Sequence, residues 1–290
     1  MHDEDNRIFM TIIPEPAWED LIAELLKLRG TAVIIGTTDS GKSTLAHYLI
    51  RKLVSESLKV CLVDSDVGQS SIGLPGTIGL KVFNENKGLK DFTSEKMSFV
   101  GTINPAKKIP FIIDTTKRMS DTCMKSSDIT LIDTSGLVTG ETGRALKVGK
   151  IKAIKPEHVI AVQRQDELEH ILELIENLKI HRHRTSQHAK IRNIATRTHY
   201  RKKKFDDYFA DAQTAGFLLY TNEAKFLYNS RPFSPQERMF KKGTLIGLNH
   251  DDDTIALGIL DDITDTSVTF VSPVKSLKKI NRVVFGDITV

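Results

Sequence analysis

The sequence predicts an α/β fold, in which a doubly wound, mostly parallel sheet is followed by a small β-rich C-terminal unit. Near-continuous apolar runs alternate with amphipathic segments up to about residue 178. This alternation is typical of parallel strands covered by helices on both faces. Beyond residue 215 the apolar runs become short and are separated by Gly, Asp, Asn and Pro, which indicates strands joined by turns.

Three parts are predicted along the chain. Residues 1–30 form a strand at Phe9–Pro14 and a helix at Glu15–Arg29 that packs on the core, because apolar residues recur there at helical spacing. Residues 31–214 form the α/β domain, and residues 215–290 form the β-rich unit. The predicted strands of the α/β domain are Thr31–Ile35, Lys59–Asp64, Met97–Gly101, Asp128–Asp133 and His158–Val162. Its predicted helices are Lys42–Val54, Asp114–Lys125, Thr142–Ile154 and Glu167–Leu178. The C-terminal strands are expected at Phe217–Tyr220, Lys225–Tyr228, Leu245–Leu248, Ile255–Leu260 and Val268–Val271.

The composition of the 290 residues, with 40% hydrophobic and 27% charged residues, is that of a soluble globular protein. No apolar run approaches the roughly 20 residues that span a bilayer, and the acidic N-terminus is the reverse of a signal peptide. Cys61 and Cys123 lie in or beside apolar segments without CxxC spacing, which predicts free thiols in a reducing compartment. We therefore expect a cytoplasmic protein without membrane contact.

A phosphate-binding loop follows the first strand of the α/β domain. The pattern GxxxxGK[ST] is matched in full, between an apolar strand and an amphipathic helix. Its glycines allow main-chain N–H groups to surround an anion at the helix start. Lys42 is expected to reach the β- and γ-phosphates, and the Ser43 hydroxyl to ligate Mg²⁺. The predicted nucleotide-binding residues are Gly36, Thr37, Thr38, Asp39, Ser40, Gly41, Lys42, Ser43 and Thr44. The α/β domain is therefore predicted to be a P-loop NTPase.

Carboxylates stand at the ends of two further strands. Asp64 and Asp66 end the second strand, where a metal ligand or a proton acceptor belongs, and either could face the phosphates. Asp133 ends another strand and begins a DxxG sequence that closes with Gly136, as in nucleotide switches. The predicted Mg²⁺ ligands are Ser43, Asp64 and Asp133. For each carboxylate the alternative is a turn residue at a strand end.

A basic segment follows the α/β pattern. From His181 to Lys204 there are nine Lys or Arg, four His and no acidic residue, unlike an ordinary solvated helix face. We interpret residues 181–205 as a lid over the nucleotide and a strip that binds nucleic-acid phosphates. The alternative is a mobile, charged surface hairpin.

Several motifs together resemble the polynucleotide 5′-hydroxyl kinases, the family that includes the RNA kinase of the pre-mRNA cleavage machinery and the rRNA-processing kinase. The similarity covers about residues 30–210, and the chain looks like a minimal, prokaryote-like member of the family. Its specific part is the string that joins Asp66-Val-Gly-Gln69 to Pro75-Gly76-Thr77, downstream of the phosphate loop. The sequences Gly101–Pro105, Asp133–Gly140 and Phe205–Phe209 resemble further motifs of the family in the same order.

The resemblance implies roles for individual residues. Lys42 would hold the phosphates, and Asp66 would accept the proton of the attacking 5′-hydroxyl. Gln69, the segment Pro75, Gly76 and Thr77, and Gly136 would contact the substrate. Arg197 and Arg201 would close over the triphosphate and neutralise the transferring phosphoryl group. The sequence departs from the family at Leu137, which replaces a Trp, so stacking worth roughly 1–3 kcal/mol per base is missing or supplied elsewhere.

The resemblance implies ATP- and Mg²⁺-dependent transfer of the γ-phosphoryl group to the 5′-hydroxyl end of RNA or DNA. The partner is then a nucleic acid, and the choice between RNA and DNA stays open. ATP is expected over GTP because the chain lacks the guanine-recognition motif. The alternative is a protein of a different class, a nucleotide-dependent switch or scaffold ATPase in a nucleic-acid-processing complex. A small-molecule kinase fits the long basic segment less well.

Overall fold

The computed structural model describes residues 12–85, 89, 91–210 and 216–290. The chain divides into two compact units. The first unit comprises Met1–Val63, Lys81–Phe92 and Lys117–Ile191, and the second comprises Asp64–Leu80, Thr93–Thr116 and Arg192–Val290. The predicted strand at Phe9–Pro14 falls largely outside the described residues.

The first unit is a parallel sheet with helices. Its strand order is β2-β5-β1-β6-β7, in which β5 and β6 run parallel to β1, and β7 runs parallel to β6. The strands are β1 (Gly30–Gly36), β2 (Val60–Ser65), β5 (Ile129–Thr134), β6 (His158–Gln163) and β7 (Lys179–Arg184). The helices are α2 (Ala17–Lys27), α3 (Lys42–Ser55), α5 (Gly140–Ile154) and the single turn α6 (Glu169–Leu172).

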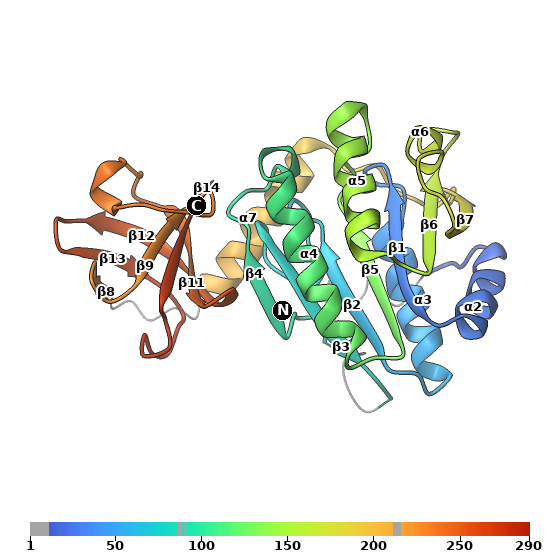
Figure 1. The fold of residues 1–290 in the computed structure, drawn as a ribbon, viewed down its shortest axis with the longest axis horizontal. Coiled ribbons are helices and arrows are strands. Elements are labelled where there is room, and N and C mark those ends of the chain that lie inside the picture. Colours follow the sequence, from blue (N-terminus) through green and yellow to red (C-terminus); the bar gives the residue numbers. More distant parts are fainter. Residues whose placement is uncertain (1–11, 86–88, 90, 211–215) are drawn as a thin grey trace. The chain divides into compact units, whose positions relative to one another are not determined.

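Helices α3 and α5 belong to crossovers that run in opposite directions across this sheet. The chain moves from β1 through α3 to β2 on one side of the order, and from β5 through α5 to β6 on the other. Because such connections are right-handed, the two helices cover opposite faces (Figure 1). The prediction of a doubly wound sheet is confirmed. Almost every side chain of β1, β2, β5 and β6 is buried, as the apolar runs require.

The second unit is β-rich and largely antiparallel. Its strands follow the order β10-β9-β14-β11-β12-β4-β3, with β13 and β8 branching from β12. The strands are β3 (Thr77–Phe83), β4 (Lys96–Phe99), β8 (Phe217–Tyr220), β9 (Lys225–Tyr228), β10 (Arg231–Pro232), β11 (Thr244–His250), β12 (Asp253–Ile263), β13 (Ser267–Val271) and β14 (Arg282–Thr289). Helix α4 (Ile109–Met124) bridges the two units in sequence, and α7 (Ile194–Ala210) lies in the second unit.

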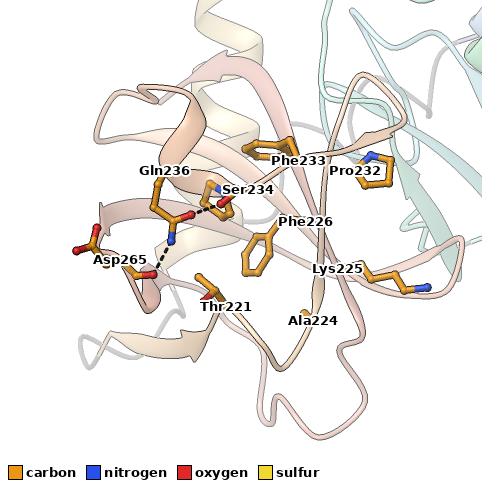
Figure 2. A pocket seen from close by; sticks show the side chains of 10 residues that line it. Thr221, Ala224, Lys225, Phe226, Pro232, Phe233, Ser234, Gln236 and Asp265 are labelled. Atoms are coloured by element: carbon orange, nitrogen blue, oxygen red, sulfur yellow. Dashed lines mark hydrogen bonds between the residues drawn. The ribbon is translucent and has the colours of Figure 1, made fainter.

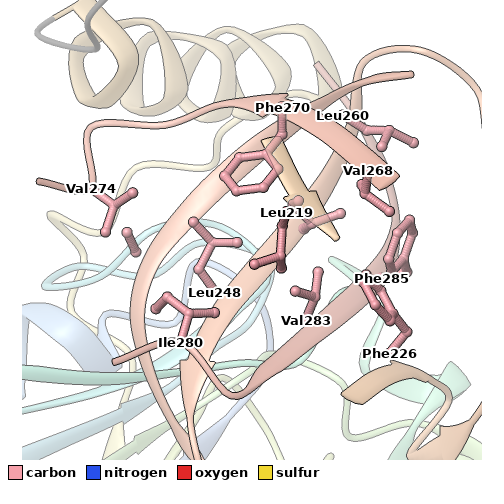
Figure 3. Packing of buried hydrophobic residues seen from close by; sticks show 12 residues of the cluster. Leu219, Phe226, Leu248, Leu260, Val268, Phe270, Val274, Ile280, Val283 and Phe285 are labelled. Atoms are coloured by element: carbon pink, nitrogen blue, oxygen red, sulfur yellow. The ribbon is translucent and has the colours of Figure 1, made fainter. Parts of the chain in front are cut away.

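Two clusters of apolar side chains hold the second unit together. One fills the space between the C-terminal strands, with Leu219, Leu248, Phe270 and Phe285 at its centre (Figure 3). The other joins Phe205 of α7 to Leu74, Phe99, Leu245, Leu257 and Ile288. The C-terminal strands therefore share the first cluster as their core, and helix α7 and the segment around Leu74 pack on the second.

The structure adds elements that the sequence patterns missed. Strand β3 is antiparallel to β4, and its apolar pattern is interrupted by Gly79 and Lys81. Helix α6 is one turn long instead of the predicted Glu167–Leu178. Strand β7 overlaps the start of the predicted basic lid. No apolar run indicated it, because β7 is an edge strand that, among the described residues, pairs with β6 alone.

The expectation of two free thiols is wrong in this structure. Cys61 of β2 and Cys123 of α4 form a disulfide with a Cα–Cα distance of 5.7 Å. The two residues are 62 positions apart, so the sequence alone gave no spacing pattern from which to infer the pair.

Candidate nucleotide- and substrate-binding site

The phosphate loop connects β1 to α3 in the predicted conformation. Asp39 and Gly41 adopt positive φ angles of 57° and 93°, and Gly41 is the N-cap of α3 without a side-chain cap. The first amides of this 14-residue helix are therefore left for an anion. A Cβ on Gly36 would stand 2.4 Å from the Val162 carbonyl oxygen, so only glycine fits there. Lys42 donates to the Thr37 carbonyl at 2.6 Å, within the loop.

Ser43 and Asp133 meet as the sequence predicts. The Ser43 hydroxyl donates to Asp133 Oδ2 at 2.5 Å. Strand β5 pairs in register with β1, with Asp133 opposite Ile34, so Asp133 ends its strand beside the phosphate loop. A hydroxyl and a carboxylate are oxygen ligands that suit Mg²⁺. The Ser43 hydroxyl and the Asp133 carboxylate therefore fit as ligands of Mg²⁺.

Gly136 is in close contact with the phosphate loop itself. A Cβ at this position would lie 2.2 Å from Thr38 Oγ1 and 2.5 Å from both Thr38 N and Thr38 Cα. The segment is held from α5, where the fully buried Lys147 donates to Thr134 Oγ1 at 2.8 Å and to the Ser135 carbonyl. Gly136 was predicted to contact substrate, and the structure gives it a close contact with the loop backbone.

Asp64 has a different environment from the one expected of a metal ligand. It is fully buried, and its Oδ1 accepts from Asp66 N at 3.0 Å. Its Oδ2 accepts from Ser70 Oγ, from both N and Oγ of Ser71, and from Ile72 N, at 2.5–3.3 Å. Burial raises the pKa of Asp64, the nearby Asp66 raises it further, and these hydrogen bonds act in the opposite direction. Because its oxygens organise the segment 66–72, we leave Asp64 out of the proposed Mg²⁺ ligands.

Asp66 stands at the start of that segment and is half-buried. Its Oδ1 accepts from Gly68 N at 2.9 Å and from Gln69 N at 3.1 Å. Within the residues that the structure describes, Oδ2 has no hydrogen-bond partner. Two amides therefore fix the carboxylate while one oxygen is left for a further proton donor, the arrangement that a general base needs.

The other predicted substrate residues fall into two groups. Gln69 is half-exposed and donates through Nε2 to the Gly68 carbonyl at 2.9 Å and to the Arg197 carbonyl at 3.5 Å. Pro75, Gly76 and Thr77 are buried. Gly76 has φ 81°, and a Cβ there would meet Ile288 at 2.5 Å. These three residues support the segment from within the second unit.

Helix α7 carries both predicted arginines and docks on the Asp64–Gly73 segment. Tyr200 donates its hydroxyl to the Ser70 carbonyl at 2.8 Å, and Lys204 donates to the Gly73 carbonyl at 3.4 Å. Arg197 and Arg201 are partly exposed on this helix. Arg201 donates to the Thr198 hydroxyl at 3.0 Å.

The basic segment is divided between the two units of the structure. Residues up to Ile191 belong to the first unit, and those from Arg192 to the second. Several of its cations pair with acids that lie just outside residues 181–204, one helical turn along α7 or in the turn after β6. These pairs are Lys202 with Asp206, Lys203 with Asp207, Arg182 with Glu169, and Arg184 with Asp166. The positive field of the segment is therefore weaker than its composition suggests.

The second unit also contains a cavity of about 630 Å³ beside the β9–β10 hairpin (Figure 2). Phe226, Phe233 and Lys225 line it. Gln236 at its rim donates through Nε2 to the Asp265 carbonyl at 2.6 Å and accepts through Oε1 from the Ser234 hydroxyl. These polar groups satisfy one another, so we assign no ligand to this cavity.

Two further observations concern the described part of the chain. Its helices include none with the length and apolarity needed to cross a bilayer. It also contains no cluster of three or more His, Cys, Asp or Glu side chains arranged to hold a metal ion.

Comparison with known proteins identifies the family. The family model described as mRNA cleavage and polyadenylation factor CLP1 P-loop matches residues 36–211. The chain belongs to this family. Within the CLP1 P-loop family it is similar to the polyribonucleotide 5′-hydroxyl-kinases of two archaea. It is 36% identical to that of Pyrococcus horikoshii over 206 residues, which are 69% of this chain and 56% of that protein. It is 35% identical to that of Methanocaldococcus jannaschii over 220 residues, which are 72% and 60%. The chain thus spans a little over half the length of these relatives.

Solved structures of the CLP1 P-loop family share the fold. The wild-type Clp1p–Pcf11p complex contains a chain that matches 96% of this one with a TM-score of 0.70 at 12% identity, covering 81% of that chain. A second Clp1p structure, which describes ATP loss in a point mutant, matches 94% of this chain with a TM-score of 0.69 at 10% identity, covering 79% of that chain. At this identity the likeness is one of fold.

Arg164 and Tyr200 lie outside the site residues predicted from the sequence, yet both make contacts there. The guanidinium of Arg164 donates to Thr37 Oγ1 at 3.0 Å and to the Asp39 carbonyl at 2.9 Å, so it binds the phosphate loop from the neighbouring strand end. Its only local signal is its position directly after a buried strand. The Tyr200–Ser70 bond joins residues 130 positions apart, and no sequence pattern indicates it.

Proposed function

We propose that this protein is a polynucleotide 5′-hydroxyl kinase that transfers the γ-phosphoryl group of a nucleoside triphosphate to the 5′-hydroxyl of RNA or DNA. The observation that carries the proposal is that one chain holds both a complete phosphate loop, in its first unit, and the half-buried Asp66 carboxylate, in its second, whose Oδ1 is fixed by two amides. The archaeal relatives named as polyribonucleotide 5′-hydroxyl-kinases support the same reaction.

On the donor side, the residues bind and neutralise charge. The amides at the start of α3 and the Lys42 ammonium would hold the β- and γ-phosphates. Ser43 and Asp133 would hold Mg²⁺, which when bound neutralises phosphate charge and orients the triphosphate. Phosphoryl transfer depends mostly on positioning and charge neutralisation, so this set covers the donor half of the reaction.

On the acceptor side, a proton must leave the attacking hydroxyl. Asp66 Oδ2 would accept this proton as the hydroxyl oxygen bonds to the γ-phosphorus and the bond to the nucleoside diphosphate breaks. Arg197 and Arg201 would neutralise the transferring phosphoryl group, a role worth on the order of 10³–10⁵ in rate where it operates. Tyr200 would hold helix α7, which carries both arginines, on the Asp64–Gly73 segment through its bond to Ser70.

The test is transfer of labelled γ-phosphate to matched 5′-hydroxyl RNA and DNA oligonucleotides. We expect labelling by the wild-type protein, loss of at least 100-fold in turnover for Asp66→Asn with nucleotide affinity retained, and loss of nucleotide binding for Lys42→Ala. Asp261→Asn, which removes an exposed carboxylate of the second unit, serves as the control with unchanged turnover. A wild-type protein that binds MgATP but labels neither oligonucleotide would refute the kinase and favour the switch or scaffold ATPase.

Variants of the arginines test whether they act on turnover or on nucleotide affinity. Arg201→Ala should lower turnover far more than nucleotide affinity, because charge neutralisation acts mainly in the transition state. Equal losses in the two quantities would limit Arg201 to ground-state binding. Oligonucleotide affinity should fall steeply as salt is raised, and a flat salt dependence would exclude the basic segment as a phosphate-contacting surface.

A further inference from the structure

Tyr228 of β9 lies among aromatic side chains of the second unit. Its ring centroid is 5.5 Å from that of Phe240 and 6.3 Å from that of Phe233, both in edge contact. Phe285 of β14 packs on the same two phenylalanines, at 4.5 Å and 5.3 Å between ring centroids. The Tyr228 hydroxyl donates to Asp287 Oδ1 at 2.8 Å. Because both its ring and its hydroxyl are held, Tyr228 is a rigid support for the cations around it.

Arg238 stacks on the Tyr228 ring. Its guanidinium carbon lies 3.9 Å from the centroid of this ring and 5.5 Å from that of Phe240, within the range of a cation–π contact. The side chain is exposed, and its N–H groups have no hydrogen-bond or ion-pair partner in the part of the chain that the structure describes. A guanidinium held by its face presents its donor edge outward, and that edge matches the oxygens of a phosphate. Arg238 is therefore oriented for an anion in advance.

Three further cations lie around the same ring. Arg231 is exposed and is the antiparallel partner of Tyr228 in the β9–β10 hairpin, so the two side chains share a face. Lys107 is exposed, and its Nζ lies 3.8 Å from Asp287 Oδ2. Lys108 Nζ lies 5.9 Å from the Tyr228 centroid and donates to a main-chain carbonyl at 2.9 Å, and burial lowers the pKa of this lysine. Among the described residues, Asp287 is the acid that pairs with these cations, so a net positive charge is left. We call the ring and its cations the Tyr228 cluster: Lys107, Lys108, Tyr228, Arg231 and Arg238.

A short loop joins the Tyr228 cluster to the Asp64–Gly73 segment within the second unit. A Cβ on Gly68 would stand 3.1 Å from the Ile103 carbonyl oxygen and 3.4 Å from Asp66 Oδ1, so the loop touches this segment beside the carboxylate. From Ile103 to Lys107 the chain spans at most about 14 Å. Since a nucleic-acid strand advances about 3.4 Å per phosphate, about four nucleotides cover this span. A strand whose 5′ end lies at Asp66 therefore reaches the cluster, and a dinucleotide does not.

We propose that the Tyr228 cluster binds the phosphodiester backbone of a polynucleotide substrate, a few nucleotides beyond its 5′ end. The proposal rests on the proposed function, since the strand it takes is the one whose 5′-hydroxyl meets Asp66. A nucleic acid is favoured over an acidic protein because a short loop of the same unit connects the cluster to that carboxylate. The Tyr228 ring is covered by Arg238 and the phenylalanines, so phosphates are bound and bases are not read. Affinity then depends on strand length and salt, and not on sequence.

The experiment compares a dinucleotide, a 12-mer with a 5′-hydroxyl and the same 12-mer with a 5′-phosphate, together with a glutamate-rich peptide. Dissociation constants are measured by calorimetry at several salt concentrations for the wild type, Arg238→Ala, Arg231→Ala and the control Lys96→Ala. Lys96 is also an exposed cation of the second unit, and it pairs with Asp253 at the start of β4. Melting temperatures of all four proteins show whether the fold is kept.

Each arginine variant should weaken both 12-mers about three- to tenfold, between the effect of an exposed ion pair and that of a charge-assisted hydrogen bond. The slope of log affinity against log salt should become shallower by about 0.7, the value for one phosphate contact on a single strand. The dinucleotide should bind each variant as it binds the wild type. Lys96→Ala should match the wild type with every ligand.

Four outcomes would overturn the proposal. Affinities and salt slopes of both arginine variants equal to those of the wild type would mean that the cluster does not touch the strand. Equal losses for the dinucleotide and the 12-mers would place the effect at the 5′ end. An equal loss in Lys96→Ala would assign the effect to net charge alone. Tighter binding of the glutamate-rich peptide than of the 12-mers would identify an acidic protein as the partner.

The 12-mer with a 5′-phosphate separates this proposal from the proposed function, because its binding requires no phosphate transfer. If the arginine variants lose affinity for it as expected and transfer to the 5′-hydroxyl 12-mer fails, the kinase is refuted and the cluster stands as a surface for nucleic acid. If transfer occurs and both variants bind like the wild type, the kinase stands and the cluster is refuted.

Discussion

The contact between Gly136 and the phosphate loop gives the sharpest prediction, the effect of Gly136→Ala. The new Cβ would stand 2.2 Å from Thr38 Oγ1 and 2.5 Å from the Thr38 N and Cα atoms. These distances are about 1 Å shorter than ordinary van der Waals contact. A hydroxyl can rotate away, but the backbone of Thr38 cannot, so the loop itself must move by a comparable distance.

Gly136→Ala is expected to lower both the stability of the fold and the affinity for nucleotide, and the two losses have separate causes. Overpacking of this size costs about 1–3 kcal/mol of unfolding free energy. Displacing a loop amide from the phosphates removes a hydrogen bond to a charged group, worth about 1.5–3 kcal/mol. We therefore expect the affinity for MgATP to fall at least tenfold.

Gly140→Ala is the matched control. A Cβ at Gly140 meets nothing within 4 Å, but its φ of 64° is strained for alanine, at a cost of about 1–2 kcal/mol. The two variants should lose similar stability in thermal denaturation, and only Gly136→Ala should lose MgATP affinity in calorimetry. Equal MgATP affinity in both variants would refute the reasoning, because the steric contact would then have no effect on the loop.

Three further predictions follow from other contacts. Tyr200→Phe removes the bond to the Ser70 carbonyl, worth about 1 kcal/mol; it should raise the KM for a 5′-hydroxyl oligonucleotide several-fold in steady-state assays, and an unchanged KM would contradict a positioning role. Burial and the neighbouring His158 lower the pKa of His181 to about 4. The unfolded chain therefore binds more protons between about pH 6.5 and 4, so stability should fall as pH falls through this range, by about 1–2 kcal/mol after discounting for the half-exposed ring. His181→Asn should flatten this dependence in urea titrations, and an equal slope would assign it to other groups. Reduction of the Cys61–Cys123 disulfide, which closes a long loop, should lower stability by about 4 kcal/mol, and a melting temperature insensitive to reductant would show that the pair does not form.

Local patterns were enough to predict the phosphate loop and the carboxylate beside it. The phosphate loop could be predicted because its glycines, Lys42 and Ser43 are contiguous, and their chemistry depends on backbone conformation and helix position more than on distant partners. Asp133 could be placed beside Ser43 because strand ends of a parallel sheet lie at one edge. The alternation of apolar runs was likewise enough for the sheet of the first unit and for most strands of the second.

The surroundings of Asp64 and of the basic segment depended on contacts that form only when the chain folds. Asp64 looks like a strand-end metal ligand, yet its oxygens accept bonds from residues 66–72 once that segment folds over it. The basic segment looks uniformly positive, yet Glu169 and Asp166 come from another element to pair with it.

The sequence by itself determined that a triphosphate-binding loop stands at the edge of a doubly wound sheet, because that loop is made of neighbouring residues whose backbone angles and charges suffice. The tertiary structure decided which side chains surround it. It turned Asp64 inward, set Gly136 against Thr38 and brought Arg164 to the loop. Each of these depends on strands and turns meeting in space, which hydrophobic periodicity along one segment does not encode.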